Sequence, residues 1–394
     1  MSLLEPGHHA IVDSLARALA STAAERDRAG GHAAAERELI RRSGLLVLSV
    51  PREHGGLGAN WPAVFDVVRR LAREDSALAH VFGFHHLQIA SVLVFGNAEQ
   101  QRRLLRHTVD GHLFWGNALN PLDKRLVASP VAGGWRLDGI KSYASGSVGS
   151  DRLTFSAVLP AGAGETVQTL VGNIATRTPG ITVREDWDSF GQRQTDSGTV
   201  NFDAVFLPAA DVLQAPGFVA TPRSTLRQLI SQLTMANLYL GLAQGAFEAA
   251  RRYTLDEARP WFNSGVPHAH DDALVQHRYG DLRLKARAAE ALADIAAAQL
   301  QDALDRGDAL DAAERGRVAI AIAEAKVLAH RASLEIGSQL FELTGARATS
   351  TSRGLDRYWR NARVHTLHDP VDHKLREIGR HALTGESPTP TAYS

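Results

Sequence analysis

The spacing of apolar residues changes twice along this 394-residue chain, and this change restricts its fold more than any other feature. In the first part, apolar residues recur at intervals of three and four positions, which is the pattern of an amphipathic helix. In the middle the period becomes two, as in strands, and then long helical patterns return. The sequence therefore predicts a multidomain α+β protein with an N-terminal helical domain (1–112), a β domain (113–215) and a C-terminal helical domain (216–394).

The middle part consists of short alternating segments such as "GWRLDGIKSYASG", "RLTFSAVLP" and "GTVNFDAVFLP". No insert between them is long enough for a helix, so they predict a β-barrel or sandwich. The last part has long periodic stretches with short connections, which predict a four-helix bundle. Its Ala- and Gly-rich faces suit an oligomer interface, and the tail "TGESPTPTAYS" is expected to be loose or to form a surface strap.

Charge and composition weigh against several classes of protein. The formal net charge is zero and the pI is about 7.4, so neither nucleic acid nor a membrane is expected as a partner. The chain has no cysteine, which rules out disulfides and thiolate chemistry. Its start lacks the basic and continuous apolar segments of a signal peptide, and no apolar run is expected to reach the roughly 20 residues that span a bilayer. A soluble, cytoplasmic protein is therefore expected.

Near the C-terminus, the segment "RNARVHTLHDP" brings His365, His368 and Asp369 within five residues. Three interpretations are open: a metal site, a proton-handling site, or the polar end of a helix. On a helix the two histidines would share a face, and a helix C-terminus favours a protonated imidazole. A zinc site would need further ligands, and the chain offers neither cysteine nor a second ligand cluster, so no metal is expected.

Segments in all three parts resemble the acyl-CoA dehydrogenase superfamily over nearly the whole chain. "PREHGGLGA" resembles its first-domain loop, "GGWRLDGIKSYASG" its hairpin beside the flavin, and "FGQRQTDSGTVNFDAVFLP" its later β strands. Longer matches, including "ANLYLGLAQGAFEAARRYT" and "GLDRYWRNARVHTLHDPV", resemble its flavin-dependent monooxygenase branch, the dibenzothiophene monooxygenase-like (group D) enzymes. The resemblance implies the superfamily's fold of a helical domain, a β domain and a four-helix bundle.

The resemblance to this branch implies a two-component monooxygenase. Such an enzyme receives reduced FMN from a separate NAD(P)H:flavin reductase, and O2 then forms a flavin 4a-hydroperoxide that transfers one oxygen atom. The expected substrate is a small apolar molecule that contains sulfur or an aromatic ring. A homotetramer, which is usual in the superfamily, is also expected, and FAD is the less favoured cofactor.

One departure separates the chain from the dehydrogenases. Their catalytic glutamate stands in a "YEG" context, whereas the matching segment here reads His368, Asp369, Pro370. Asp369 is one methylene shorter, and the proline after it restricts its backbone, so the dehydrogenase base is expected to be lost. Three alternatives stay open: an FAD-dependent acyl-CoA dehydrogenase with Asp369 as its base, a non-catalytic flavin-binding or sensor protein, and an enzyme that N-hydroxylates amino sugars.

The resemblance places His80, Ser145 and His368 at the reacting part of the flavin. His368 is expected to hydrogen-bond the peroxide and to manage its proton, because an imidazole titrates near neutral pH. The resemblance maps His80, rather than His85 or His86, onto a pocket histidine, and the Ser145 hydroxyl can donate to flavin N5. The alternatives are a core histidine for His80, a turn serine for Ser145, and a surface or capping histidine for His368.

Other residues are implied as flavin contacts or pocket walls. Besides Ser145, these contacts are Asn117 and Tyr143, with Trp187 as a wall against the ring. Phe84, which replaces a tyrosine of the family, and His365 are expected to line the substrate pocket. A buried tryptophan is often only part of a core, and this alternative stays open for Trp187.

An anion site for the FMN phosphate is the last expectation from the resemblance. Arg259 in "EARPW" is expected to bind the phosphate from a neighbouring subunit, because a guanidinium matches phosphate geometry. The residues that would complete this site are Arg347, Ser352 and Arg353. The alternative for these side chains is a solvated salt bridge.

Overall fold

The computed structural model describes residues 4–160, 162 and 167–394, so the first three residues of the predicted N-terminal domain lie outside it. The first part of the described chain is helical, as predicted. Its helices are α1 (Pro6–Ala20), α2 (Ala23–Ala29), α3 (Ala34–Arg42), α4 (Trp61–Glu74), α5 (Ser76–Phe95) and α6 (Ala98–Gly111). The 3₁₀ turns η1 (Leu45–Val47) and η2 (Arg52–His54) connect α3 to α4.

Helix α5 contains no Asp, Glu, Lys or Arg and forms part of the core. Asp75 caps it, because its carboxylate accepts a 3.0 Å hydrogen bond from the backbone N–H of Leu78. By length and composition α5 could cross a membrane, so the expectation that no apolar run reaches this length is wrong. Of the apolar stretch, 83% is buried inside the protein, which is typical of a core helix in a soluble fold.

The middle part forms strands that pair into one mixed sheet. Within the described residues eight strands take part: β1 (Trp115–Ala118), β2 (Val127–Val131), β3 (Gly134–Lys141), β4 (Arg152–Val158), β5 (Thr169–Ala175), β6 (Ile181–Val183), β7 (Val200–Pro208) and β8 (Val212–Gln214). Their order is β6-β7-β3-β2-β4-β5-β8, and β1 pairs in parallel with β4. Side chains such as Leu137, Phe155 and Phe202 form a core that belongs to the sheet.

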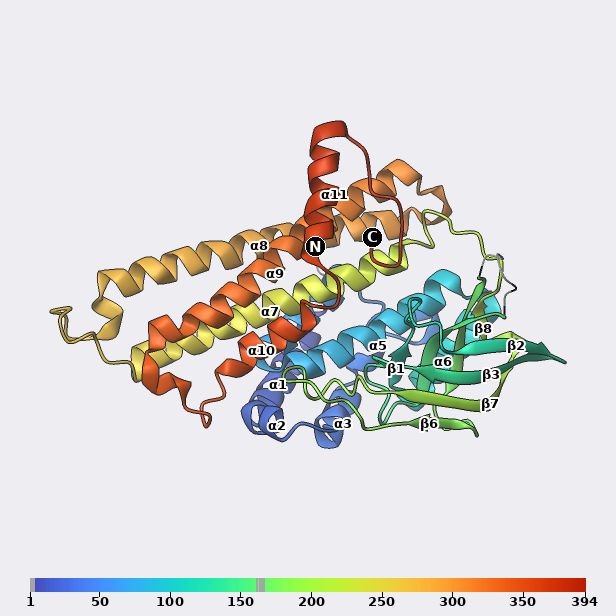
Figure 1. The fold of residues 1–394 in the computed structure, drawn as a ribbon, viewed down its shortest axis with the longest axis horizontal. Coiled ribbons are helices and arrows are strands. Elements are labelled where there is room, and N and C mark those ends of the chain that lie inside the picture. Colours follow the sequence, from blue (N-terminus) through green and yellow to red (C-terminus); the bar gives the residue numbers. More distant parts are fainter. Residues whose placement is uncertain (1–3, 161, 163–166) are drawn as a thin grey trace.

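The last part returns to helices. They are α7 (Leu226–Asp256), α8 (Ala273–Asp305), α9 (Ala312–Thr344), α10 (Asp356–His365) and α11 (Val371–Thr384). The 3₁₀ turns are η3 (Ala209–Asp211) after the sheet, η4 (Ala269–Asp271), η5 (Gly307–Ala309) and η6 (Ala346–Thr349). The long helices α7, α8 and α9 lie side by side (Figure 1), and the predicted fold class is confirmed.

The N-terminal helices and the long C-terminal helices share one hydrophobic core. Leu71 of α4, Phe82 of α5, Leu233 of α7 and Leu340 of α9 belong to the same buried cluster. Helix α7 is buried along most of its length because α4 and α5 pack on it together with α8 and α9. This shared core fixes α5 against α7, and both helices supply walls of the site described below.

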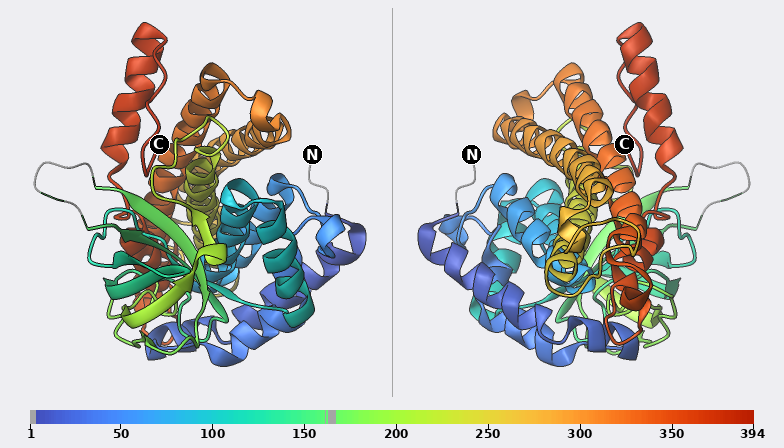
Figure 2. Two further views of the ribbon diagram at one scale, coloured as in Figure 1. Left: turned by 90° about the vertical axis from the view of Figure 1, so that its right-hand side faces the viewer. Right: turned by 90° about the vertical axis from the view of Figure 1, so that its left-hand side faces the viewer.

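The sheet lies beside the N-terminal helices, and the long C-terminal helices run above both (Figure 2). Helix α11 projects from this body, and the chain after it turns back toward α7 (Figure 1). The tail ends buried: Ser394 is 3% exposed, and its carbonyl oxygen accepts a 2.7 Å hydrogen bond from Arg315 Nη2. Of the two states expected for the tail, the structure shows the strap.

Candidate active site

A cavity of about 610 Å³ lies where the three parts of the chain meet. Its walls come from α5, the segment after β1, the loop before β7, the start of α7 and the end of α10. The volume is within the roughly 300–1,000 Å³ that is usual for cofactor and ligand pockets. The cavity brings together these residues that the sequence singled out: His80, Phe84, Asn117, Tyr143, Ser145, Trp187, His365 and His368.

Two histidines face each other inside the cavity. The rings of His80 and His365 lie edge to face, with centroids 4.7 Å apart, and His80 stacks on Phe84 with centroids 4.0 Å apart. Within the described chain, none of the four imidazole nitrogens has a hydrogen-bond partner. Burial lowers the pKa of His80 to about 3 and holds the pKa of His365 well below its ordinary value. Both rings are therefore neutral near pH 7, and each keeps one donor and one acceptor for a ligand.

The expectation that a helix end favours a protonated imidazole is wrong for His365. The residue does end α10, but it is 7% exposed. Burying the charged ring costs more free energy than its interaction with the helix dipole provides. At an exposed helix end this interaction typically contributes only about 0.3–1 kcal/mol.

We expect this burial to make the protein less stable in mild acid. The unfolded chain binds a proton at His80 below about pH 6.5, whereas the folded chain does not until about pH 3, so the free energy of unfolding falls as pH drops through that window. One such histidine gives a slope of about 1.4 kcal/mol per pH unit. Urea unfolding between pH 7 and pH 4.5 measures it, and His80→Phe should make the curve less steep, while the buried His85 and His365 keep their share of the slope.

A matched control for this experiment is His373→Phe, because His373 is exposed on α11. That variant should keep the wild-type slope. If His80→Phe also keeps it, His80 is not held neutral by the fold.

Of the three histidines that line the cavity, His368 is the one whose ring a hydrogen bond orients. Its Nδ1 lies 3.1 Å from Asp369 Oδ1, and the same oxygen accepts a 2.5 Å hydrogen bond from Lys326 Nζ. An ionised carboxylate only accepts hydrogen bonds, so Nδ1 carries the proton in this contact. The free nitrogen of this cavity-lining residue is therefore Nε2.

Asp369 is not placed to act as a catalytic base. It is 8% exposed, and it does not line the cavity. Burial acts to raise its pKa, but the hydrogen bond from His368 and the charge of Lys326 outweigh burial and hold the pKa well below its usual range. A carboxylate that stays ionised and is held by two partners orients His368 rather than taking a proton from a substrate.

A row of hydroxyl groups supports Ser145. Ser145 Oγ lies 2.8 Å from Ser197 Oγ, which donates to Thr195 Oγ1 at 2.8 Å. Thr195 Oγ1 in turn donates to the carbonyl oxygen of Gln192 at 2.9 Å. The next residue, Gly146, has φ of 69°, a conformation that favours glycine, and its N–H donates to the carbonyl of Thr195 at 2.8 Å. These bonds fix the segment on which Ser145 lies.

Aromatic and amide groups complete this side of the cavity. Tyr143 and Trp187 lie edge to face with centroids 6.1 Å apart, and Trp187 Nε1 donates to the carbonyl of Gln192 at 2.9 Å. Asn117 Oδ1 accepts a 3.0 Å hydrogen bond from Gln88 Nε2. This bond leaves the amide hydrogens of Asn117 to a ligand.

The predicted phosphate-binding residues lie outside this cavity in the same subunit. Arg259 is exposed and follows the C-terminal end of α7, whereas the cavity contacts the N-terminal end of that helix. Arg353 Nη1 pairs with Glu257 Oε1 at 2.7 Å. Binding of the FMN phosphate therefore stays a prediction for these residues, and it would require a neighbouring subunit. They are Arg259, Arg347, Ser352 and Arg353.

Sequence reasoning missed several residues of the cavity. Arg227, Gln228 and Ser231 enter it from the first turns of α7, and Tyr393 enters it from the tail. The Tyr393 ring lies edge to face on His368, with centroids 5.4 Å apart. One signal could have found Arg227: it is a lone cation in an otherwise uncharged segment, "TLRQLISQLTMANL".

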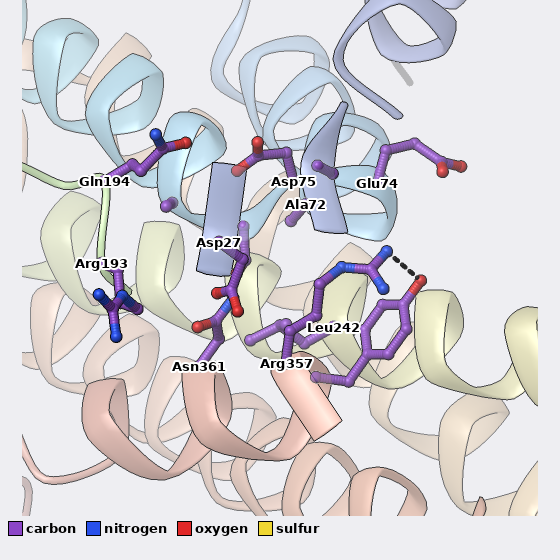
Figure 3. Close-up of a pocket in the computed structure, with 13 residues that line it drawn as sticks. Asp27, Ala72, Glu74, Asp75, Arg193, Gln194, Leu242, Arg357 and Asn361 are labelled. Atoms are coloured by element: carbon purple, nitrogen blue, oxygen red, sulfur yellow. Dashed lines mark hydrogen bonds between the residues drawn. The ribbon is translucent and has the colours of Figure 1, made fainter. Parts of the chain in front are cut away.

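A second, much smaller pocket lies beside the loop that carries Gln192 (Figure 3). Its volume of about 10 Å³ is that of about one water molecule, so it holds no substrate. Its wall residue Asn361 accepts a 2.6 Å hydrogen bond from the Gln192 N–H and donates to Ser76 Oγ at 3.1 Å. Asp27, also in its wall, accepts from Arg360 Nη2 at 2.5 Å. This pocket belongs to the polar junction that holds α2, α5, α10 and the loop together.

The cavity fits a flavin ring, which is flat and aromatic with polar edges. Tyr143 and Trp187 offer aromatic surfaces and Asn117 offers amide donors. Because Ser197 Oγ donates to Thr195, the Ser145 hydroxyl hydrogen goes to Ser197, and Ser145 Oγ offers the flavin an acceptor rather than the donor expected from the sequence. Buried polar atoms without a partner in the described chain point the same way, because such atoms usually have one in a complete site. They are the ring nitrogens of His80 and His365 and the Oε1 atom of Gln192.

Two family models match the chain. They are "Acyl-CoA dehydrogenase, N-terminal domain" over residues 8–112 and "Acyl-CoA dehydrogenase, C-terminal domain" over residues 233–373. The chain is also 46% identical over 385 residues to the probable FMNH2-dependent monooxygenase SfnC of Pseudomonas putida, covering 98% of this chain and 97% of the relative.

Solved structures give the same result. The methanesulfinate monooxygenase MsuC from Pseudomonas fluorescens superposes with a TM-score of 0.95, at 47% identity and with 100% of both chains covered. The dibenzothiophene monooxygenase TdsC from Paenibacillus sp. A11-2, in complex with FMN and indole, superposes with a TM-score of 0.95 at 38% identity, covering 98% of this chain and 100% of that one.

Proposed function

The chain belongs to the acyl-CoA dehydrogenase family and, within it, to the FMNH2-dependent monooxygenases, and from this premise we propose that it oxygenates a small sulfur compound in the cavity lined by His80 and His368. The cofactor is FMN, used in its reduced form. When bound, reduced FMN reacts with O2 and supplies one oxygen atom to the substrate. The observation that carries the proposal is the neutral histidine pair beside an oriented His368.

The chain's own residues have three tasks in this proposal. Asn117, Ser145 and Trp187 hold and orient the flavin ring. The buried faces of Phe84, His80 and the surrounding apolar wall exclude water from the reacting atoms. His368 Nε2 holds or gives the proton at the oxygen that is transferred, because Asp369 fixes its other nitrogen.

The dehydrogenase alternative lacks its base. The candidate named from the sequence, Asp369, is bound by Lys326 and His368 and lies outside the cavity lining. Among the described residues that line the cavity, the one carboxylate is Asp188, which is exposed. The high similarity to FMNH2-dependent monooxygenases supports oxygen transfer instead.

We expect oxygen incorporation when the protein is supplied with NADH, FMN and a flavin reductase. Methanesulfinate, dibenzothiophene and indole form the test panel, because relatives named for these sulfur compounds, or solved with indole, share at least 38% of the sequence. Under ¹⁸O2, one product of the panel should gain a single ¹⁸O atom by mass spectrometry. The monooxygenase proposal would be wrong if no substrate of the panel gave a labelled product and the protein, with FAD bound, used acyl-CoA to reduce a dye. The chain would then be an acyl-CoA dehydrogenase in function.

The assembly and the supply of reduced flavin belong to the same proposal. A separate reductase provides FMNH2, and the subunits form a homotetramer in the cytoplasm. Large apolar side chains support an interface near the predicted phosphate site: Trp261 is 68% exposed and Phe262 is 78% exposed. Light scattering measures the mass of the assembly in solution. Because Arg259 lies outside the cavity of its own subunit, a monomeric protein would contradict its predicted role in binding the FMN phosphate of a neighbouring subunit.

A further inference from the structure

Arg227 is a buried cation without an acidic partner. It lies in the first turn of α7, is 6% exposed and lines the cavity. Its Nε donates to Ser91 Oγ at 3.1 Å, while its Nη2 has no hydrogen-bond partner, and Arg227 makes no ion pair within the part of the chain that the structure describes. Two other buried arginines have carboxylate partners: Arg37 lies 3.1 Å from Asp196, and Arg69 lies 2.6 Å from Asp294. Arg152 and Arg315, also buried, bind Asn173 and Thr225 instead and do not line this cavity.

A guanidinium in such a place calls for an anion. Burying an ion without a counter-ion costs several kcal/mol, and burial alone lowers the pKa of Arg227 only to about 10, so it stays charged at neutral pH. The N-terminal end of the 31-residue helix α7 adds positive potential beside it. Gln228, at the next position, and Ser231, one turn further on, also line the cavity, and their amide and hydroxyl groups can donate to an anion.

The chemistry of the substrates distinguishes the candidates. Dibenzothiophene and indole are neutral and leave the charge of Arg227 uncompensated. An organosulfinate carries one negative charge on two oxygens beside an oxidisable sulfur, which matches the fork of donors on a guanidinium. Phe84 and Leu87 of α5 also line the cavity, so an alkyl group has an apolar wall to contact.

We propose that Arg227 binds the anionic head of an organosulfinate, and that this substrate class, rather than a neutral aromatic, is the one the cavity selects. The inference rests on the proposed function. The sulfinate sulfur gains one oxygen atom from O2 and is oxidised by two electrons to a sulfonate. The other oxygen atom becomes water with two electrons and two protons from reduced FMN. Substrate and product both carry one negative charge, so Arg227 stays paired throughout.

The test is anion binding without turnover, with methanesulfonate as an inert probe and methanesulfinate as the substrate. Calorimetry on the protein with oxidised FMN should show that Arg227→Met lowers the binding affinity for both anions by about 30-fold or more, as expected for loss of one partner of a buried charge pair. Arg227→Lys keeps the charge but not the forked pair of donors, so its anion affinity should lie between those of the wild type and Arg227→Met. The KM for methanesulfinate should rise in parallel.

Two further measurements separate a binding defect from a folding defect. Without an anion, Arg227→Met should melt no lower than the wild type, because it removes an uncompensated charge. Methanesulfonate should raise the melting temperature of the wild type and not that of Arg227→Met. Equal anion affinity in both proteins would overturn the proposal. So would a matched loss of FMN affinity, which would make the flavin phosphate the anion.

These outcomes distinguish the proposal from the function on which it rests. Anion binding through Arg227 with no labelled product from any substrate would overturn the monooxygenase and leave the anion site. Oxygenation of dibenzothiophene with no methanesulfonate binding would support the monooxygenase and overturn the anion site at Arg227.

Discussion

Replacing His368 with alanine is expected to lower the rate of substrate oxygenation by about 10²–10⁴-fold, the usual contribution of a positioned acid or base. The reason is geometric: Asp369 holds Nδ1 of the ring at 3.1 Å, and the ring belongs to the cavity wall, so Nε2 is the nitrogen that can serve the transferred oxygen. Oxygenated product is measured by chromatography, with consumption of O2 and formation of hydrogen peroxide followed in parallel.

The division between product and peroxide tests the role of His368 more sharply than the rate alone. Reduced flavin still reacts with O2 in the variant, so O2 consumption should continue while hydrogen peroxide replaces the oxygenated product. His373→Ala is the matched control, because this histidine is exposed on α11 and lies outside the cavity. If His368→Ala formed as much oxygenated product per O2 consumed as the wild type, the residue would handle no proton in the reaction.

Asp369 should act through His368 and not by itself. Asp369→Asn keeps the shape but can present its amide N–H2 to Nδ1, which reverses the hydrogen-bond pattern of the ring. We expect a lower oxygenation rate and a changed pH profile, with FMN affinity retained. An unchanged pH profile would reduce Asp369 to a structural residue.

Replacing Lys326 with methionine is expected to lower the free energy of unfolding by about 3–5 kcal/mol at pH 7. Lys326 is 2% exposed, and its Nζ binds Asp369 Oδ1 at 2.5 Å and Gln232 Oε1 at 2.6 Å. The variant leaves the Asp369 carboxylate buried without its cation. Equilibrium unfolding in urea measures the loss.

Two companion variants test the cause of that loss. The double variant Lys326→Met with Asp369→Asn removes both charges and should recover part of the stability. Lys285→Met removes a lysine that pairs with Asp281 at 2.7 Å near the surface and should lower the free energy by at most about 1 kcal/mol. A Lys326→Met protein as stable as Lys285→Met would mean that water already reaches the pair.

Local sequence determined the order of elements in this protein. Apolar residues spaced three and four apart produce helices such as α4, and alternation produces strands such as β7, because each period places one face of an element in the core. Helix α5 and strand β4 are apolar or buried on all sides, and their places in the fold do not follow from such a period. The HDP segment showed, without any structure, that the dehydrogenase glutamate is absent. The histidines and the tryptophan that line the cavity, together with Tyr143 and Ser145, were also named from sequence, through motifs that resemble those of the family. Other hydroxyl-bearing residues of the lining, such as Ser231 and Tyr393, were not.

Only the tertiary structure decided which charges these residues carry and what faces them. A sequence cannot show that His365, at the end of a helix, is neutral, because its pKa depends on burial by α7 and α5. It cannot show that Asp369 meets Lys326, which is 43 positions away in the chain. Arg227 looks like an ordinary helix-start cation until α5 buries it without a carboxylate. Desolvation and long-range pairing are properties of packed surfaces, so they exist only once the chain has folded.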